Sequence, residues 1–134
     1  MNVLNYIKLF FLTFPLFLAI DFTWLGLIAK KFYDNSLIHF DRTLRWQAAT
    51  LVYVLIVSAV IVIAVPKYLE NGLLIDAFMW GSFTGFIIYG AHDLTNMSTL
   101  TDWSWKIVLI DMIWGTTACG VVGVVASMFS KIVL

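Results

Sequence analysis

The stretch Trp46–Val65 reads WQAATLVYVLIVSAVIVIAV, a run without a single charged side chain that is followed directly by Pro66. As a helix rising 1.5 Å per residue, such a run spans the hydrocarbon core of a bilayer, about 30 Å. Its many β-branched residues would favour a strand in water, but a lone strand in lipid leaves its backbone polar groups without partners. The stretch therefore predicts a transmembrane helix that ends at Pro66.

Three further apolar runs flank this stretch, at about residues 3–29, 73–96 and 107–129. Each is long enough to cross a bilayer as a helix, and the connections between them are short. We therefore expect a single transmembrane domain over residues 1–134. Its fold class is all-α integral membrane, an antiparallel bundle of four transmembrane helices.

The composition excludes several classes of protein. Apolar residues make up 62% of the chain and charged residues 12%, against about 45–50% and about 25% in an average soluble domain. So few charges do not cover the surface of a small soluble domain. Eight Lys and Arg balance eight Asp and Glu, so the basic surplus that nucleic-acid binding needs is missing. The single cysteine, Cys119, excludes a disulfide framework. The lipid bilayer is the expected partner.

The basic residues predict an orientation in the membrane. The first and third connections carry or border five of them, Lys30, Lys31, Arg42, Arg45 and Lys106. The opposite side carries three, Lys8, Lys67 and Lys131. Because basic residues concentrate on the cytoplasmic side, we expect those two connections in the cytoplasm and both termini outside.

Apart from Asp76 at the start of the third predicted span, three acidic residues fall inside the spans: Asp21, Asp93 and Asp111. In an antiparallel bundle all three belong to the same leaflet. A carboxylate there costs on the order of 2.5–3.5 kcal/mol on insertion scales, so such residues indicate a functional site. A shared proton, the neighbouring His92, an arginine of the first connection or a bound cation could neutralise them.

Two of these acids are followed by a tryptophan at the same spacing, Asp21 by Trp24 and Asp111 by Trp114. Residues three apart share one helix face, so each pair can line a common wall. We therefore expect one polar pocket for proton or ligand binding, formed by Asp21, Trp24, His92, Asp93, Asn96, Asp111 and Trp114. The three acids are also the candidate ligands of a divalent metal, the one cofactor we consider.

Small residues recur every four positions in the third and fourth predicted spans. Such ridges let helix backbones approach closely in lipid. The residues expected to pack these two helices together are Gly81, Gly85, Gly115, Cys119 and Gly123.

Four motifs occur in one order along the chain: Asp21-x-x-Trp24-Leu-Gly26, Tyr89-Gly-Ala-His-Asp93-Leu-Thr-Asn96, Asp102-Trp103 and Asp111-x-x-Trp114-Gly115. In this order they resemble the small bacterial membrane proteins catalogued as domain of unknown function 2177, over essentially the whole chain. The family pattern more often has Tyr directly before the Asp of the second motif, where this chain has His92. The resemblance implies a four-helix protein of the bacterial inner (plasma) membrane, and it implies no activity.

Three classes of function fit an acidic cluster inside a membrane. The pocket could bind or transport a proton, a metal ion or a small organic cation, with the tryptophans forming a cage. Alternatively, the chain is a membrane-embedded enzyme acting on a lipid or isoprenoid, with Asp21, Asp93 and Asp111 as metal ligands or as acid and base. A third alternative is a non-catalytic helper subunit whose acids pair with a membrane partner. The size and helix number are similar to those of small multidrug exporters that work as homodimers.

Overall fold

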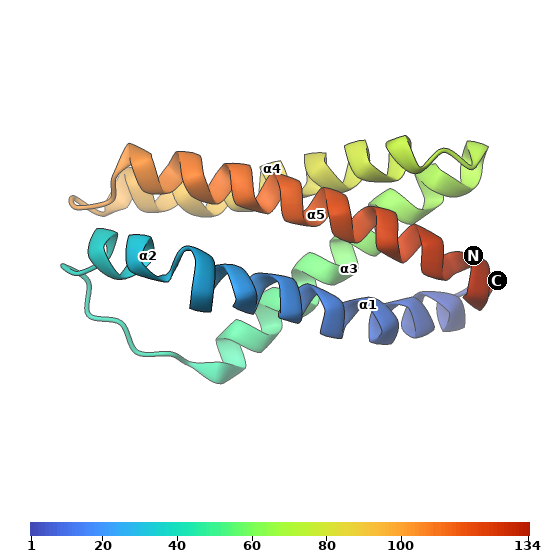
Figure 1. Ribbon diagram of the computed structural model, residues 1–134, viewed down its shortest axis with the longest axis horizontal. Coiled ribbons are helices and arrows are strands. Elements are labelled where there is room, and N and C mark those ends of the chain that lie inside the picture. The colour runs from blue at the N-terminus through green and yellow to red at the C-terminus, as the bar shows by residue number, and fades with distance from the viewer.

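The computed structural model describes residues 1–134 and contains helices but no strand (Figure 1). The elements are α1 (Val3–Thr23), the π-helix η1 (Trp24–Ile28), α2 (Lys30–Ser36), α3 (Trp46–Asn71), α4 (Leu74–Thr99) and α5 (Trp105–Val133). Four segments are long and apolar enough to cross a membrane: Val3–Ile28, Trp46–Asn71, Leu74–Thr99 and Trp105–Val133. The predicted all-α membrane fold with four spans is confirmed.

The two ends of the bundle differ in what they carry. Both termini lie at one end, together with the turn between α3 and α4, while connections 37–45 and 100–104 lie at the other end (Figure 1). The helices α4 and α5 run side by side and make the most extensive contact in the molecule. Helix α3 crosses the bundle obliquely, so its N-terminal half diverges from α5 at the end that carries the two connections. We call this the loop end.

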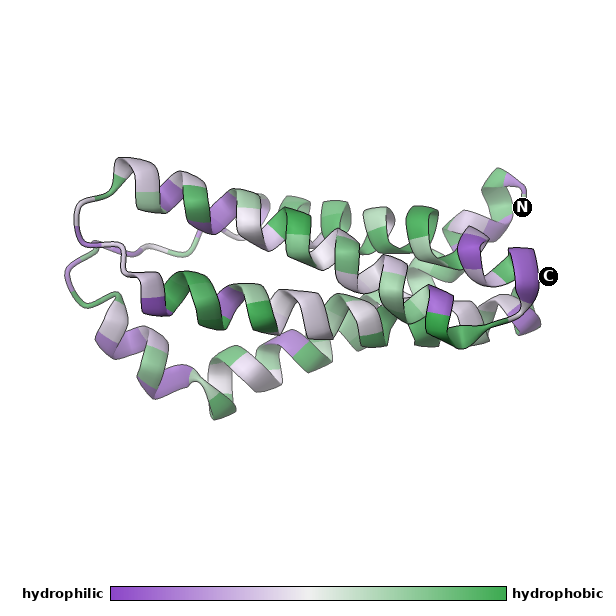
Figure 2. Cartoon of the chain, turned by 90° about the horizontal axis from the view of Figure 1, so that it is seen from above, coloured by the Kyte–Doolittle hydropathy of each residue, from purple (hydrophilic) through white to green (hydrophobic).

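The surface of the bundle is apolar, as a lipid environment requires. Hydrophobic residues dominate the length of the helices and hydrophilic ones gather toward the ends (Figure 2). Large apolar side chains such as Phe11, Leu55 and Ile113 are exposed along the spans. Since lipid tails are as apolar as these side chains, the exposed positions carry no penalty in a bilayer.

Glycines set the close contact between α4 and α5. A Cβ added at Gly81 would lie 2.5 Å from the carbonyl oxygen of Cys119, and one added at Gly123 would lie 2.7 Å from that of Ala77. A Cβ at Gly85 would collide with the carbonyl of Gly115. In each case the obstacle is backbone, so the two helices could not approach this closely with larger residues.

The C-terminal helix ends lie beyond the sequence-based expectation, most of all in the first two spans. The prediction that the second span ends at Pro66 is wrong, because α3 continues through Pro66 to Asn71 and stops at Gly72, which has a φ of 76°. A proline removes one backbone hydrogen bond, and membrane helices tolerate this loss. Glycine adopts the left-handed conformation readily and so terminates the helix. In the first span, the helical path continues beyond residue 29 into α2.

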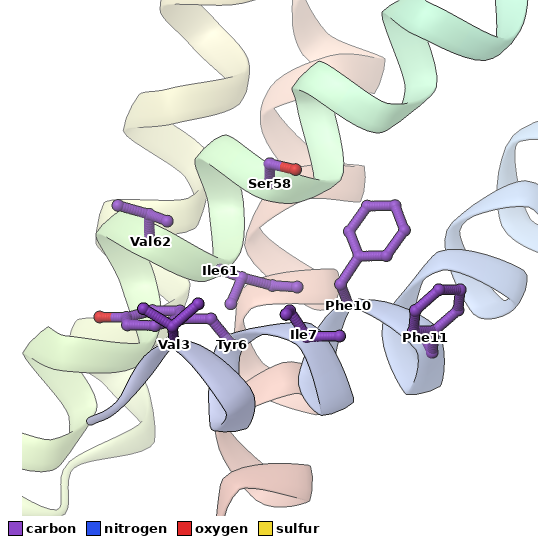
Figure 3. A pocket seen from close by; sticks show the side chains of 8 residues that line it. All are labelled: Val3, Tyr6, Ile7, Phe10, Phe11, Ser58, Ile61 and Val62. Carbon is purple, nitrogen blue, oxygen red and sulfur yellow. The ribbon is translucent and has the colours of Figure 1, made fainter.

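A groove of about 290 Å³ lies between the N-terminal half of α1 and the middle of α3 (Figure 3). Its lining includes Ile7, Phe10, Ile61 and Val62, and the hydroxyl of Ser58 is one of its few polar groups. The groove contains no charged side chain. It lacks the polar groups that binding sites use to orient a ligand.

Candidate functional site

A larger cavity, of about 520 Å³, lies at the loop end between all four spans. Helix α1 contributes Asp21 to its lining, α3 contributes Tyr53, α4 contributes Tyr89 and α5 contributes Asp111. Tyr33 of α2 lines it from the loop end. Of its 16 lining residues 13 are hydrophobic, so the two carboxylates face a largely apolar space. An apolar cavity with a few convergent polar groups is the usual form of a small-molecule site.

Asp21 is only 3% exposed, and its two carboxylate oxygens accept hydrogen bonds from two different helices. The hydroxyl of Tyr53 donates to Oδ2 at 2.6 Å. The indole Nε1 of Trp114 donates to Oδ1 at 3.0 Å. The acid at position 21 therefore ties α1 to both α3 and α5.

Asp111 is held by a tyrosine that lies outside the spans. The hydroxyl of Tyr33 donates a short hydrogen bond to Oδ1 of Asp111 and accepts one from Nε1 of Trp24 at 3.3 Å. Burial raises the pKa of Tyr33 well above its usual value, and the hydrogen bond to Asp111 raises it further. Tyr33 therefore remains a protonated donor toward this carboxylate at physiological pH.

The two tryptophans join these carboxylate sites into one network. The rings of Trp24 and Trp114 are stacked, with centroids 4.4 Å apart. Trp114 bonds to Asp21, while Trp24 bonds to Tyr33 and through it to Asp111. Side chains from α1, η1, α2, α3 and α5 thus form a continuous set of contacts around the cavity.

The π-helix η1 lies inside this network. It begins at Trp24, and the N–H of Ala29 closes its turn by donating to the carbonyl of Trp24 at 2.7 Å. Single π-helical turns are rare and occur frequently at functional sites. Here the turn connects the helix that carries Asp21 to the helix that carries Tyr33.

The remaining residues of the expected pocket lie at its margin or behind its wall. Asp93 is fully buried beside Asp111 and does not line the cavity. His92 lines the cavity, and Asn96 does not reach it but lies 3.1 Å from Nε2 of His92 through its Nδ2. Trp24 is separated from the cavity by its partner in the stack, Trp114. The structure thus brings Asp21, His92, Asp111 and Trp114 around one cavity.

No basic side chain forms an ion pair with Asp21, Asp93 or Asp111. The ion pairs are Lys30–Asp34, Arg42–Asp34 and Lys67–Glu70, all on exposed side chains. Arg42, considered above as a neutralising group, pairs instead with Asp34, whose pKa is lowered chiefly by its hydrogen bond with Lys30.

The geometry offers no ligand set for the expected divalent metal. No group of three or more His, Cys, Asp or Glu side chains lies close enough together to hold a metal ion. Both carboxylate oxygens of Asp21 already accept hydrogen bonds, from Tyr53 and from Trp114.

Four aromatic residues line the cavity that the sequence did not assign to the pocket: Tyr33, Tyr53, Tyr89 and Trp103, of which Tyr89 and Trp103 were noted only as parts of motifs. Aromatic residues near span ends are typical of the membrane interface, so their types alone do not mark them. The sequence gives one weak indication for Tyr53. It interrupts an otherwise apolar stretch, and it lies on the same helix face as Ala49, four residues earlier. For Tyr33 the sequence gives none, since its role depends on a helix that the sequence did not predict.

The fold and site define a class of protein: a four-span helical membrane protein with acidic and aromatic residues around a cavity at one end. A family model described as "Predicted membrane protein (DUF2177)" matches residues 6–128, and the chain belongs to this family. The resemblance drawn from the four motifs is thereby confirmed. No curated protein and no solved structure matches the chain.

Proposed function

We propose that the cavity at the loop end binds a small organic cation. The observation that carries this proposal is a pair of carboxylates, Asp21 and Asp111, that line an aromatic cavity and have no basic partner. Carboxylates inside a membrane protein need a compensating charge, and a cationic ligand supplies it. The alternatives, a lipid-directed enzyme and a helper subunit, are not favoured by a specific contact.

The lining favours an organic cation over a metal ion. Tyr33, Tyr53, Tyr89, Trp103 and Trp114 present aromatic groups, and the faces of such rings attract cations with apolar substituents. A metal ion instead requires several oxygen or nitrogen ligands around one point, which these side chains do not provide. The cavity volume lies within the range of small-molecule sites, about 300–1,000 Å³.

The site would serve uptake or export if the cavity opens alternately to the two sides. In this proposal the connections 37–45 and 100–104 face the cytoplasm of a bacterial cell, and both termini lie outside its plasma membrane. The five-to-three distribution of basic residues supports this orientation. The cavity would then load from the cytoplasmic leaflet.

Binding of benzyltrimethylammonium to the purified protein in detergent tests the proposal, with tryptophan fluorescence as the readout because Trp114 lines the cavity. Neopentylbenzene, which has the same shape without the charge, is the matched ligand control. We expect the cation to bind at least about tenfold more tightly, equivalent to about 1.4 kcal/mol. Equal binding of both compounds, or no binding of the cation, would overturn the proposal.

Variants assign the binding to the two acids. Asp21→Asn and Asp111→Asn should each weaken cation binding by about tenfold or more, because a charged partner is lost in a poorly solvated site. Asp102→Asn is the control, since Asp102 is exposed in the connection between α4 and α5. Unchanged affinity in both Asp21→Asn and Asp111→Asn would contradict the assignment.

A further inference from the structure

Asp93 differs from the other two membrane acids, which accept hydrogen bonds from tyrosines, because it makes no hydrogen bond of ordinary length. Its side chain is 0% exposed, and neither carboxylate oxygen accepts a hydrogen bond. Its polar neighbours are the carboxyl of Asp111 and the buried indole Nε1 of Trp103, an uncharged donor that faces it. Buried carboxylates that remain ionised are ordinarily hydrogen-bonded or paired, so this surrounding suits a neutral carboxylic acid.

The groups that face Asp93 offer no positive charge to hold it ionised. From α5 it faces Asp111, and from α2 it faces Tyr33, which donates a hydrogen bond to Asp111. On its own helix, His92 precedes it and contacts Asn96. On α3 the titratable side chain of the network is Tyr53, which donates its hydrogen bond to Asp21. Asp93 therefore lies between a second carboxyl group and aromatic residues, while His92 and Asp21 face Asp111, the other member of the pair.

We infer that Asp93 and Asp111 hold one proton between them in the ligand-free protein and release it when a cation enters the cavity. This inference rests on the proposed cation site. Asp111 lines the cavity and Asp93 lies behind it. When no ligand is bound, the shared proton lowers the negative charge of the pair by one. On binding, the O–H bond of the carboxylic acid breaks, the proton passes to solvent, and the ligand's positive charge replaces it. The charge of the occupied and empty sites is then the same.

Infrared spectroscopy of the ligand-free protein tests the shared proton without any cation. The C=O stretch of a protonated carboxyl is separated from that of a carboxylate and shifts in heavy water. We expect such a band in the wild type, its loss in Asp93→Asn, and its retention in Asp76→Asn, which alters an acid in the first turn of α4 at the opposite end. Asp111→Asn is the second variant, and it should shift the band because Asp93 loses its charged neighbour. A wild type without the band, or a band unaffected by both substitutions in the pair, would overturn the inference.

Calorimetry then tests the release. Titration of benzyltrimethylammonium in two buffers with different ionisation enthalpies gives the number of protons released per bound cation. We expect about one in the wild type and close to zero in Asp93→Asn, whose amide has no proton to lose. Correspondingly, wild-type affinity should rise with pH, and this dependence should be lost in Asp93→Asn.

The two proposals fail in different ways. Cation binding without proton release, and without a carboxyl band, would refute the shared proton and leave the cation site intact. A carboxyl band that depends on Asp93, in a protein that binds no cation, would refute the cation site while supporting the protonated pair.

Discussion

The indole rings of Trp24 and Trp114 lie parallel, at an interplanar angle of 5°. Each ring hydrogen-bonds through its nitrogen to a different acidic centre, Trp114 directly to Asp21 and Trp24 through Tyr33 to Asp111. A displacement of one ring therefore alters the surroundings of both carboxylates. Together with the hydrogen bond from Trp114 to Asp21, this stack joins the first and last spans at the site.

Trp114→Phe should lower the stability of the protein by about 1–3 kcal/mol, because Oδ1 of the buried Asp21 loses its donor. Trp24→Phe should have a smaller effect, since its hydrogen bond to Tyr33 is longer, at 3.3 Å. Thermal unfolding in detergent measures both. Trp105→Phe is the control, because Trp105 is 61% exposed at the start of α5. Equal stability of Trp114→Phe and the control would contradict the role of this bond.

Gly85→Ala should destabilise the bundle by about 1–3 kcal/mol, because its Cβ meets the backbone carbonyl of Gly115 and the helices must separate. Gly85→Leu should prevent folding. Gly90→Ala is the matched control on the same helix, since its nearest neighbour is the flexible end of the Met112 side chain at 3.0 Å. Melting temperatures in one detergent compare the wild type, Gly85→Ala and Gly90→Ala. If Gly85→Ala melted like Gly90→Ala, the close approach of α4 and α5 at this point would be wrong.

Stability should decline at alkaline pH in a manner that depends on Tyr33. Its pKa is raised in the folded protein by burial and by Asp111, whereas in the unfolded chain it is about 10. Above about pH 10 the unfolded state loses this proton and the folded state keeps it, so stability falls as pH rises. Unfolding free energies measured from about pH 8 to about pH 11 should fall less steeply in Tyr33→Phe than in the wild type. Identical slopes would show that Tyr33 is not shielded in the way described.

Cysteine labelling tests the orientation. In a Cys119→Ala background, a cysteine at Asn35, which is exposed in α2, should resist a membrane-impermeant reagent applied from outside. A cysteine added at the C-terminus should react. The opposite pattern, with labelling at position 35 alone, would reverse the proposed topology.

The fold could be predicted because the bilayer imposes it. Four apolar runs of sufficient length can cross lipid only as helices, so their number and the antiparallel path follow. The end of α3 could not be predicted from Pro66, since the rule that proline ends a helix comes from helices in water. The helix ends instead at Gly72, whose positive φ is a backbone conformation that glycine adopts readily.

The site could be predicted only in part. Acids inside apolar runs are costly, and this cost singled out Asp21 and Asp111. The side chains that bond to them, Tyr53 and Tyr33, are aromatic residues of a kind that is common in any membrane protein. Which carboxylate each tyrosine contacts depends on the crossing of α3 and on the direction of α2. These are tertiary features without a local sequence pattern.

The direction of α2 depends on how many residues precede it. A π-helical turn contains one residue more than an α-helical turn, and one residue corresponds to about 100° of rotation. The π-helix η1 places such a turn between Trp24 and Ile28. The additional residue rotates α2 so that the side chain of Tyr33 points toward Asp111. Deletion of the Gly26 codon would leave every side chain of the cavity in the gene product and yet turn Tyr33 away from its carboxylate. The geometry of this site is thus encoded in the length of the chain as well as in its chemistry.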